Sequence, residues 1–336
     1  MSTSSTNSSE SRIAVITGAG SGIGLNFARK LYYRNDFTHM ILAVRNEKRG
    51  EETLAAIKDT SAIKISTSSI TPSTQLIPIP CDQNSLVSVV NFCKQVKTQF
   101  SHIDLLVLNS GTISGSAFEK TSTATIDGFE AVFGINHVSH FAIFQSLLPL
   151  LQKSSPRTVP SNYSSTITYT FPRVVLTASH GHNFSKVPDN GTSIPAWKEI
   201  ATKLGRSGCF EAYCDSKLAN VLQCMEIQHK YGPLITANCL HPGGIRETNI
   251  WNPQKGIAKF LIDGIMFPIG KLFGAWQTVD EGGDTILACV EDKEGGKYRN
   301  VHKWEKPSKI GQNIEAAHAL WKASEELLQE KGYDNM

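Results

Sequence analysis

The stretch Gly18-Ala19-Gly20-Ser21-Gly22-Ile23-Gly24 directly follows the apolar run Ile13-Ala14-Val15-Ile16-Thr17 near the start of the chain. This order predicts a buried strand that turns through a glycine-rich loop into a helix. Glycines lack a Cβ atom, so the backbone can approach a phosphate group, and the N–H groups at the start of the helix favour its negative charge. The stretch therefore predicts a phosphate cradle, although a purely structural glycine turn has the same composition.

The overall composition is that of an ordinary globular chain. The 336 residues include 33 Lys and Arg against 30 Asp and Glu, a formal net charge of +3, with no long basic run. Nothing in this balance indicates a nucleic-acid partner. The length suits one α/β domain with a sizeable core. We therefore expect a single domain over residues 12–333, preceded by a disordered tail over residues 1–11 that is rich in Ser, Thr and Asn.

The cysteines and the apolar segments bear on the compartment. The seven cysteines form no C-x-x-C pair, and several lie in apolar stretches. We interpret them as reduced, packed thiols, which indicates a reducing compartment. The first residues do not resemble a secretory signal, because they have neither a basic nor an apolar segment. No stretch reaches the roughly 18 to 20 uninterrupted apolar residues of a spanning helix. We expect a cytoplasmic protein.

Strand-like and helix-like segments alternate along most of the chain. The predicted helices lie near residues 23–35, 47–59, 84–100, 122–151, 211–230 and 312–331. The predicted strands are Ile13–Thr17, His39–Val44, Gln75–Ile79, Leu105–Leu108, Arg173–Ala178, Leu234–Leu240 and, near the end, Lys297–Val301. This alternation predicts a doubly wound parallel sheet with helices on both faces. Two long loops, over residues 154–172 and 180–208, are predicted to be lids, binding loops or disordered insertions.

Tyr213 and Lys217 stand four residues apart in a predicted helix, so their side chains leave the same face one turn from each other. A phenol titrates near pH ~10, and an adjacent ammonium group favours the phenolate, which lowers the pKa of the phenol. Such a phenol can act as a general acid or base. For an isolated Y-x-x-x-K pattern, however, an incidental surface pair is the better interpretation.

The order of polar residues along the chain strengthens the functional interpretation of this pair. Before the helix of Tyr213 and Lys217 come, in turn, Asp82 after the third strand, Asn109-Ser110-Gly111 after the fourth, Asn136 in the long helix and Ser179 after the fifth strand. Most of these lie at or near the carboxyl end of a strand, where open α/β sheets bind their ligands. We therefore expect one site that combines the glycine loop with these side chains.

From Arg12 to about Tyr333 the sequence resembles the short-chain dehydrogenase/reductase family. Within that family it is most similar to retinol-dehydrogenase-like and WW-domain-oxidoreductase-like members. The likeness rests on Asn136-His137-Val138-Ser139-His140-Phe141, on Ala212-Tyr213-Cys214-Asp215-Ser216-Lys217 with Leu218-Ala219-Asn220-Val221-Leu222, and on His241-Pro242-Gly243 followed by Thr248-Asn249-Ile250. The resemblance implies a Rossmann-type dinucleotide-binding domain and an oxidoreductase that transfers a hydride.

The resemblance also implies a catalytic tetrad of Tyr213, Lys217, Ser179 and Asn136. Tyr213 would be the acid/base, and Lys217 would lower its pKa and hold the nicotinamide ribose. Ser179 would bond the substrate oxygen, and Asn136 would position a water in the proton relay. Taken alone, Ser179 is equally a turn serine and Asn136 a helix residue that satisfies backbone groups. The remaining histidines show no metal-ligand spacing, so we interpret them as packed or surface residues: His137, His140, His180, His182 and His241.

The end of the second predicted strand indicates the cofactor. No acidic residue stands there to accept bonds from a ribose 2′-hydroxyl, whereas Arg45 offers a guanidinium group suited to a 2′-phosphate. We predict NADP(H) rather than NAD(H), with a solvated arginine as the alternative. By resemblance, Asp82 would contact the adenine amine, Asn109 would line the adenine side, and Pro242, Gly243 and Thr248 would flank the nicotinamide and pyrophosphate. The full set expected to bind the cofactor is Gly18, Ser21, Gly22, Ile23, Gly24, Arg45, Asp82, Asn109, Gly111, Tyr213, Lys217, Pro242, Gly243 and Thr248.

The segment 257–273 is apolar with isolated Lys and Asp residues. In the family that the chain resembles, the region near residues 250–276 is the substrate lid, so we expect a hydrophobic carbonyl or alcohol such as a retinoid, a sterol or a long-chain aldehyde. The segment could equally dip into the surface of an intracellular membrane or lipid droplet, with Lys255, Lys259 and Lys271 at the headgroups. Packing against the core or a partner subunit is the structural alternative.

Three departures from the family pattern keep other functions open. Leu108-Asn109-Ser110-Gly111 replaces Asn-Asn-Ala-Gly, Ala178-Ser179 replaces Ser-Ser, and the long interval between Ser179 and Tyr213 predicts a remodelled loop over the site. One alternative is an NADP(H)-binding scaffold or regulatory protein with weak catalysis. Another is a reductase of a conjugated double bond in the manner of protochlorophyllide reductases, which share a Y-x-x-S-K helix.

Overall fold

The computed structural model describes residues 11–60, 72–113, 123–162, 164, 167–205, 209–245 and 276–333. Three predictions fall on other residues. The expected tail lies outside the described residues except for Ser11, and so do Thr248 and the expected lid except for Trp276.

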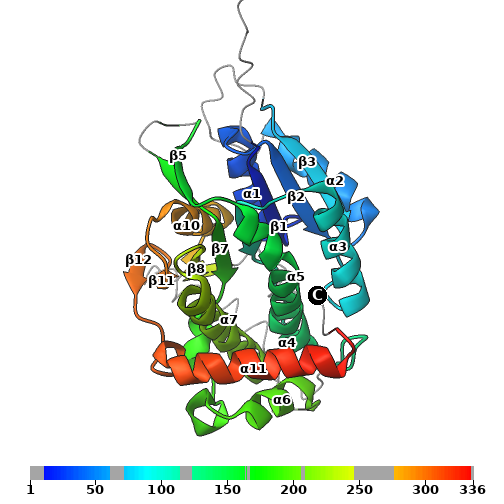
Figure 1. Cartoon of the computed structure of the whole chain (residues 1–336), viewed down its shortest axis with the longest axis vertical. Coiled ribbons are helices and arrows are strands. Elements are labelled where there is room, and N and C mark those ends of the chain that lie inside the picture. The colour runs from blue at the N-terminus through cyan, green and yellow to red at the C-terminus, as the bar shows by residue number, and fades with distance from the viewer. Residues whose placement is uncertain are drawn as a thin grey trace, which may run out of the picture.

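A central sheet of eight strands organises the described part of the chain (Figure 1). Its order is β12-β11-β8-β7-β4-β1-β2-β3, and neighbouring strands are parallel except β11 and β12. The predicted doubly wound parallel sheet is thereby confirmed. The strands are β1 Ile13–Thr17, β2 His39–Val44, β3 Gln75–Pro80, β4 Leu105–Leu108, β7 Arg173–Thr177, β8 Thr236–His241, β11 Lys297–Asn300 and β12 Lys303–Glu305.

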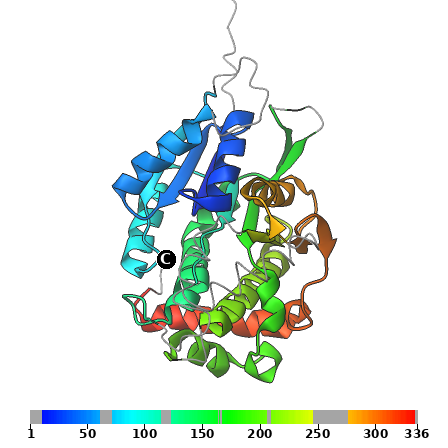
Figure 2. The same cartoon turned by 180° about the vertical axis from the view of Figure 1, so that it is seen from behind.

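Helices cover both faces of this sheet because successive strand residues point to opposite sides. Ala14 and Ile16 of β1 join one apolar cluster, and Ile13 and Val15 join the other. The first cluster is covered by α1 Gly22–Arg34, α2 Glu47–Lys58 and α10 Val279–Glu291, of which α1 and α10 lie side by side (Figure 2). The second is covered by α3 Leu86–Gln99, α4 Ala131–Phe133, the π-turn η2 Gly134–Val138, α5 Ser139–Lys153, α7 Cys209–Tyr231 and α11 Ile314–Glu330.

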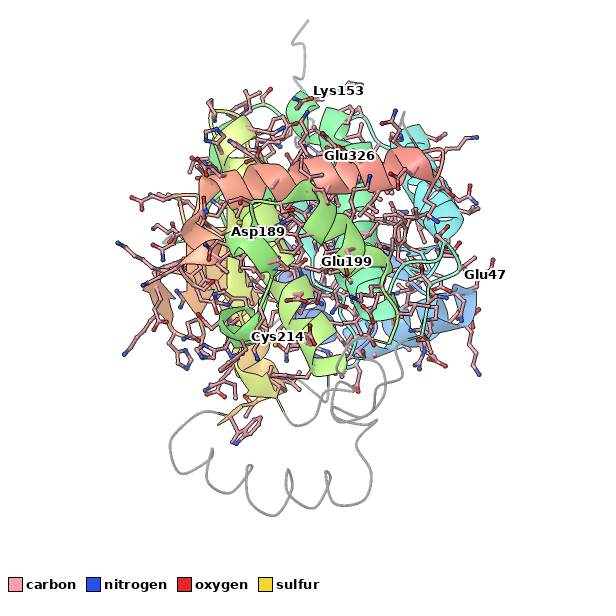
Figure 3. The ribbon with its side chains drawn as sticks, turned by 90° about the horizontal axis from the view of Figure 1, so that it is seen from below. Glu47, Lys153, Asp189, Glu199, Cys214 and Glu326 are labelled. Carbon is pink, nitrogen blue, oxygen red and sulfur yellow. The ribbon has the colours of Figure 1, made fainter. Side chains whose placement is uncertain are left out.

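The two long predicted loops hold regular structure. In the first, β5 Arg157–Pro160 and β6 Thr168–Phe171 form an antiparallel hairpin. In the second, the short 3₁₀ turns η3 His180–Phe184 and η4 Pro188–Gly191 lead into α6 Ile194–Thr202. Helix α6 packs against α11, and Figure 3 shows the two helices from below. The ammonium group of Lys198 in α6 donates a hydrogen bond to Glu326 of α11 at 2.9 Å.

Two further elements differ from the sequence prediction. Helix α10 was not predicted, because Gly282 and Gly283 are poor helix formers. A Cβ atom on Gly282 would lie 2.4 Å from Cγ2 of Ile23, so the glycine is what lets α10 approach α1. The helix expected from residue 122 begins only at Ala131. The remaining elements are the paired strands β9 Gly244–Ile245 and β10 Trp276–Gln277 and the turn η7 Ile310–Gln312.

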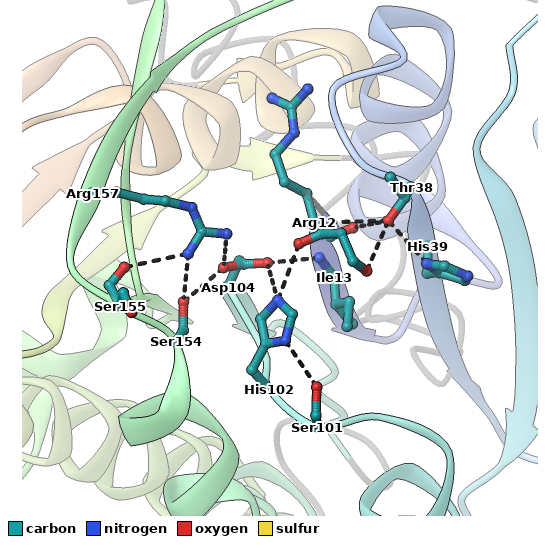
Figure 4. A network of polar contacts seen from close by, with 11 residues as sticks. Arg12, Ile13, Thr38, His39, Ser101, His102, Asp104, Ser154, Ser155 and Arg157 are labelled. Carbon is teal, nitrogen blue, oxygen red and sulfur yellow. Dashed lines mark hydrogen bonds and ion pairs between the residues drawn. The ribbon is translucent and has the colours of Figure 1, made fainter. Parts of the chain in front are cut away.

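A buried carboxylate fixes the amino ends of β1 and β4 at the edge of the sheet opposite the predicted site (Figure 4). The fully buried Asp104 accepts hydrogen bonds from the N–H of Ile13 at 2.8 Å, the hydroxyl of Ser154 at 2.7 Å and the guanidinium of Arg157 at 2.7 Å. Nε2 of His102 lies 3.4 Å from the same carboxylate. The relative position of β1 and β4 is therefore set at this end, which determines which residues emerge at the other.

One helical stretch, Ala131–Lys153, is long and apolar enough by length and composition to cross a membrane, but 83% of its most apolar window is buried inside the protein. We interpret it as a core helix. The cysteines whose side chains are described are all free and buried: Cys81, Cys93, Cys214, Cys224, Cys239 and Cys289. For these six residues the prediction of packed thiols is confirmed.

Candidate active site

The parallel strands bring the predicted site residues to one edge of the sheet. β1 lies between β2 and β4, so the glycine loop after β1 stands where the strand order reverses, the usual ligand site of such sheets. Thr17 pairs with Ala43, so the residues that follow β1 and β2 leave the sheet next to each other. The ends of β3, β4, β7 and β8 add Asp82, Asn109, Ser179 and Pro242.

The glycine loop has a backbone that side chains would block. Gly18 and Gly22 have φ values of +70° and +54°, in the left-handed region that glycine adopts without strain. A Cβ atom on Gly24 would lie 2.2 Å from the carbonyl oxygen of Gly18. The first turn of α1 therefore packs directly on the loop, as the phosphate-cradle prediction requires.

The start of α1 also lacks an internal cap. The side chain of Ser21, which precedes α1, makes no capping hydrogen bond, and the first turn of α1 holds no acidic residue. In contrast, Asn46, Ser85 and Thr278 each accept a hydrogen bond from a backbone N–H in the first turn of α2, α3 and α10. The first N–H groups of α1 and the Ser21 hydroxyl thus suit an external anion. These features fit the pyrophosphate of a dinucleotide.

Asn109 forms the floor under the glycine loop. Its amide donates to the carbonyl of Thr17 at 3.3 Å, and its Oδ1 accepts from the hydroxyl of Thr177 at 3.1 Å. The Thr17 hydroxyl oxygen in turn accepts from the N–H groups of Asn109 and Ser110 at 2.9 and 3.1 Å. Asn109 therefore joins the ends of β1, β4 and β7 through hydrogen bonds of its side chain to both neighbouring strands.

Arg45 and Asp82 follow β2 and β3, which lie on the other side of β1 from β4. Arg45 is exposed and makes no ion pair within the described part of the chain. Helix α2, which begins just after Arg45, touches the loop, because a Cβ atom on Gly20 would lie 3.0 Å from the hydroxyl oxygen of Thr53. Asp82 is half-buried and accepts from the N–H of Asn84 at 3.1 Å. Arg45 thus leaves the sheet beside the residues that follow β1, with an exposed side chain.

Ser179 and Tyr213 meet above the carboxyl end of β7. Their side chains lie close together beside Gly181, and the Ser179 hydroxyl accepts from the N–H of Gly181 at 3.1 Å. A Cβ atom on Gly181 would lie 3.3 Å from Cε1 of Tyr213 and 3.5 Å from the Ser179 hydroxyl oxygen. Burial raises the pKa of Tyr213 to about 12, and the neighbouring Ser179 hydroxyl opposes this rise.

Lys217 is bonded to the carboxyl end of β7. Its ammonium group donates to the carbonyl of Thr177 at 3.0 Å and lies 5.6 Å from the centre of the Tyr213 ring. Burial lowers the pKa of Lys217 to about 8. Burial therefore dominates the pKa values of both Lys217 and Tyr213 in this structure. That the ammonium group of Lys217 lowers the pKa of Tyr213 stays a prediction.

Asn136 lies in the π-turn η2 and is fully buried. Its Oδ1 accepts from the N–H of Thr112 at 2.7 Å, and its amide donates to the carbonyl of Thr112 at 2.9 Å and to the hydroxyl of Ser216 at 3.0 Å. Single π-turns inside α-helices often mark functional sites, because they re-aim one side chain.

Gly111 lies beside both Lys217 and Asn136. A Cβ atom on Gly111 would lie 3.2 Å from Nζ of Lys217 and 3.6 Å from Oδ1 of Asn136. The structure therefore places Ser179 and Tyr213 together beside Gly181, and Lys217 and Asn136 together beside Gly111.

The residues that follow β8 complete the edge. Gly243 has a φ of +94°, and a Cβ atom there would lie 2.3 Å from Cγ of Gln277 in β10. Pro242 and Gly243 therefore turn the chain against the β9–β10 pair. Ile23 at the start of α1 packs on Gly282 of α10.

Sequence reasoning missed the groups that hold the predicted side chains. Thr112 holds Asn136 and Thr177 holds Lys217, both through backbone atoms that no side-chain pattern reveals. His182 was interpreted only as a packed or surface histidine, yet its Nδ1 lies 2.7 Å from the carbonyl oxygen of Ser179. The spacing of three residues between Ser179 and His182 within one turn is the signal that could have found it.

Comparison with known proteins agrees with this fold and site. A family model described as short chain dehydrogenase matches residues 12–160. WW domain-containing oxidoreductase of Homo sapiens is 28% identical over 326 residues, which span 95% of this chain and 69% of that protein. Retinol dehydrogenase 12 of Homo sapiens is 28% identical over 323 residues, which span 94% of this chain and 86% of that protein.

A solved structure supports the same assignment. The crystal structure of an uncharacterized protein from Mycobacterium paratuberculosis superposes with a TM-score of 0.64 at 26% identity and covers 95% of this chain and 93% of its own. The fold and the glycine cradle are those of a dinucleotide-binding α/β protein. In sequence and in fold the chain is similar to members of the short-chain dehydrogenase/reductase family, which use nicotinamide cofactors. The predicted likeness to retinol-dehydrogenase-like and WW-domain-oxidoreductase-like members is confirmed.

Proposed function

We propose that the protein is an NADP(H)-dependent oxidoreductase that interconverts a hydrophobic carbonyl compound and the corresponding alcohol, with Tyr213 as the acid/base. The observation that carries the proposal is the close approach of the Ser179 and Tyr213 side chains beside Gly181, at the carboxyl edge of the sheet. Two hydroxyl groups converge there on the same side of the sheet as an uncapped helix start that fits a pyrophosphate.

The chain's own residues would handle the proton. The cofactor, when bound, supplies or accepts a hydride at the substrate carbon. The hydroxyl of Ser179 would donate a hydrogen bond to the substrate oxygen, and Tyr213 would transfer its proton to that oxygen during reduction. A pKa of about 12 keeps Tyr213 protonated at neutral pH, so the phenol starts a reduction in the form that donates. Lys217 would hold the nicotinamide ribose, and Asn136 would position a water in the proton relay.

Arg45 supports the choice of NADP(H). The side chain is exposed beside the glycine loop, and no carboxylate within the described residues pairs with it. A guanidinium group can bind a phosphate through two parallel hydrogen bonds, which a ribose hydroxyl does not offer.

Exposed aromatic side chains support an apolar substrate. Phe184 is 58% exposed and Phe210 is 47% exposed, and their ring centres lie 6.4 Å apart. Phe184 ends the turn that begins just after Ser179, and Phe210 precedes Tyr213 by three residues on α7. An apolar wall therefore stands beside the two hydroxyl groups, where the body of a retinoid, a sterol or a long-chain aldehyde would lie.

Turnover measurements test this proposal. We expect the purified protein to oxidise NADPH with aldehydes or ketones, with kcat/KM rising as the apolar body grows. Tyr213→Phe is expected to remove turnover while lowering the affinity for NADPH by less than about tenfold, because the phenol is one of many expected cofactor contacts but the only proposed proton donor. Absence of turnover across small and large carbonyl compounds would overturn the proposal.

One observation favours a second candidate, an NADP(H)-binding scaffold with weak catalysis. Lys217 is bonded to Thr177, and the pKa of Tyr213 is raised rather than lowered. A scaffold predicts that Tyr213→Phe preserves both NADPH binding and the cellular role of the protein, whereas an enzyme predicts loss of that role.

A further inference from the structure

We propose that His182 is a positioning residue that holds Ser179 in the orientation in which its hydroxyl meets Tyr213. This inference rests on the proposed function, since it concerns the serine that would bond the substrate oxygen. His182 touches neither substrate nor cofactor in this proposal and acts through the Ser179 backbone.

The ring of His182 makes two hydrogen bonds that fix its tautomer. The side chain is only 1% exposed. Nε2 lies 3.0 Å from the backbone N–H of Ser308, and Nδ1 lies 2.7 Å from the carbonyl oxygen of Ser179. Because a backbone N–H can only donate, Nε2 must accept, so the ring proton sits on Nδ1 and is donated to Ser179. The neutral ring therefore bridges the two residues: it accepts a hydrogen bond from Ser308 and donates one to Ser179.

Groups distant in sequence anchor this bridge. Ser308 precedes the turn η7, and its hydroxyl accepts from the N–H of Gly311 at 3.2 Å. The ring of Tyr298 in β11 packs edge-on against the His182 ring, with centres 4.9 Å apart. The place of His182 is thus set by β11 and by the segment before α11, not by its own short turn alone.

The carbonyl of Ser179 transmits this anchoring to the site. It accepts two hydrogen bonds from His182, one from the ring and one from the backbone N–H at 3.1 Å. The Ser179 hydroxyl meanwhile accepts from the N–H of Gly181. Without the ring donor, the peptide plane after Ser179 is held by a single backbone bond and can rotate. Such a rotation carries the hydroxyl away from Tyr213, and small errors in the placement of an orienting group lower the rate strongly.

Three substitutions separate this role from simple packing. His182→Asn places an amide donor near the position of Nδ1, so it keeps the bond to Ser179 and loses the one to Ser308. His182→Gln places its amide near Nε2 and keeps only the bond to Ser308. His182→Phe keeps the ring volume against Tyr298 and loses both bonds. His302→Asn, on an exposed histidine, is the matched control.

The ranking of kcat among these variants decides the question. We expect His182→Asn to stay within about threefold of the wild type, and the Gln and Phe variants to lose about tenfold or more in kcat with the KM for NADPH unchanged. A packing role predicts the reverse, with Phe the most active and Asn the least. That reverse order, or full kcat in the Gln and Phe variants, would overturn the inference. Should the Asn variant not fold, the kcat of the Gln and Phe variants still decides.

A measurement independent of turnover separates this inference from the proposed function. Nitrogen-15 NMR of the histidine rings in the wild type reports which ring nitrogen of His182 carries the proton, with His182→Phe for assignment. A proton on Nδ1 is expected. A proton on Nε2 would overturn the inference about His182, whether or not the protein turns over a carbonyl compound. Conversely, a wild type and a Ser179→Ala variant that both fail to turn over any carbonyl compound would refute the proposed function while the NMR result stands.

Discussion

The side chain of Asn136 holds both backbone groups of Thr112, the N–H at 2.7 Å and the carbonyl at 2.9 Å. Through these two hydrogen bonds the buried Asn136 fixes the loop that follows β4. The same loop holds Gly111 against the ammonium group of Lys217. The amide is the one side-chain group of this size that both donates and accepts, so the pairing needs asparagine and not aspartate.

Asn136→Asp is therefore expected to impair the protein in two ways. The carboxylate still accepts from Thr112 but cannot donate to its carbonyl or to Ser216, so the free energy of unfolding should fall by about 1–3 kcal/mol. We expect kcat to fall at least about tenfold, because the loop over Lys217 shifts. Urea unfolding and steady-state kinetics measure the two effects. The control is Asn91→Asp on the exposed face of α3, and equal behaviour of both variants would contradict the prediction.

The contact between Gly24 and Gly18 predicts that a side chain at residue 24 weakens cofactor binding. In Gly24→Ala the new Cβ atom would lie 2.2 Å from the Gly18 carbonyl oxygen, so the loop must move off α1. The affinity for NADPH, measured by fluorescence titration, should fall by at least about tenfold, because the phosphate-binding N–H groups separate.

Gly20→Ala is the graded comparison in the same loop. There the nearest atom is the hydroxyl oxygen of Thr53 at 3.0 Å, a much milder contact that a shift of a few tenths of an ångström relieves, so we expect a much smaller loss of affinity. Equal losses in the two variants would show that the Gly24 contact is not what shapes the cradle.

The features that the sequence predicted are those with a local signature. The apolar run Ile13–Thr17 and the glycines after it determine a strand, a turn and a helix within a few residues of each other. Tyr213 and Lys217 could be paired because helical spacing alone brings them to one face. These residues specified the sheet edge and most of the candidate site.

The features that it missed depend on contacts between distant segments. Helix α10 contains Gly282 because α1 packs there, which no local propensity reveals. The hairpin at Arg157–Pro160 is rich in turn-forming neighbours, and it is held by long-range bonds such as the one from the Tyr169 hydroxyl to Asp36 at 2.6 Å. The direction of the pKa change at Tyr213 likewise depends on burial, which only the folded chain determines.

Arg45→Ala tests the predicted preference for NADP(H). Loss of a charge-assisted hydrogen bond to the 2′-phosphate should lower kcat/KM for NADPH by about 10- to 100-fold. This range follows from the free energy of about 1.5–3 kcal/mol that a hydrogen bond to a charged group contributes. The value for NADH should stay within about twofold, since it lacks that phosphate. Lys48→Ala, which removes an exposed cation in the first turn of α2, is the control. A parallel loss with both cofactors would instead assign Arg45 to the fold.

Buried neutral histidines predict acid sensitivity of the cofactor-free protein. Burial lowers the pKa values of His137, His140 and His241 to about 3 each. The unfolded chain takes up these protons below pH ~6.5, while the folded chain does so only near pH 3. Between these values the unfolded state binds more protons, so stability is lost as the pH falls, by up to about 1.4 kcal/mol per pH unit for each histidine.

Urea unfolding at pH 7 and pH 5.5 measures this loss. The His140 ring, whose Nε2 lies 3.2 Å from the Thr17 hydroxyl, should contribute a distinct share. We therefore expect the free energy of unfolding of His140→Gln to be lower than that of the wild type at pH 7. Between pH 7 and pH 5.5, however, this free energy should fall less in the variant than in the wild type. His302→Gln, on an exposed ring, should retain the full pH dependence. If His140→Gln also retains it, the acid sensitivity arises from other groups, and the buried ring of His140 is not held neutral by the fold.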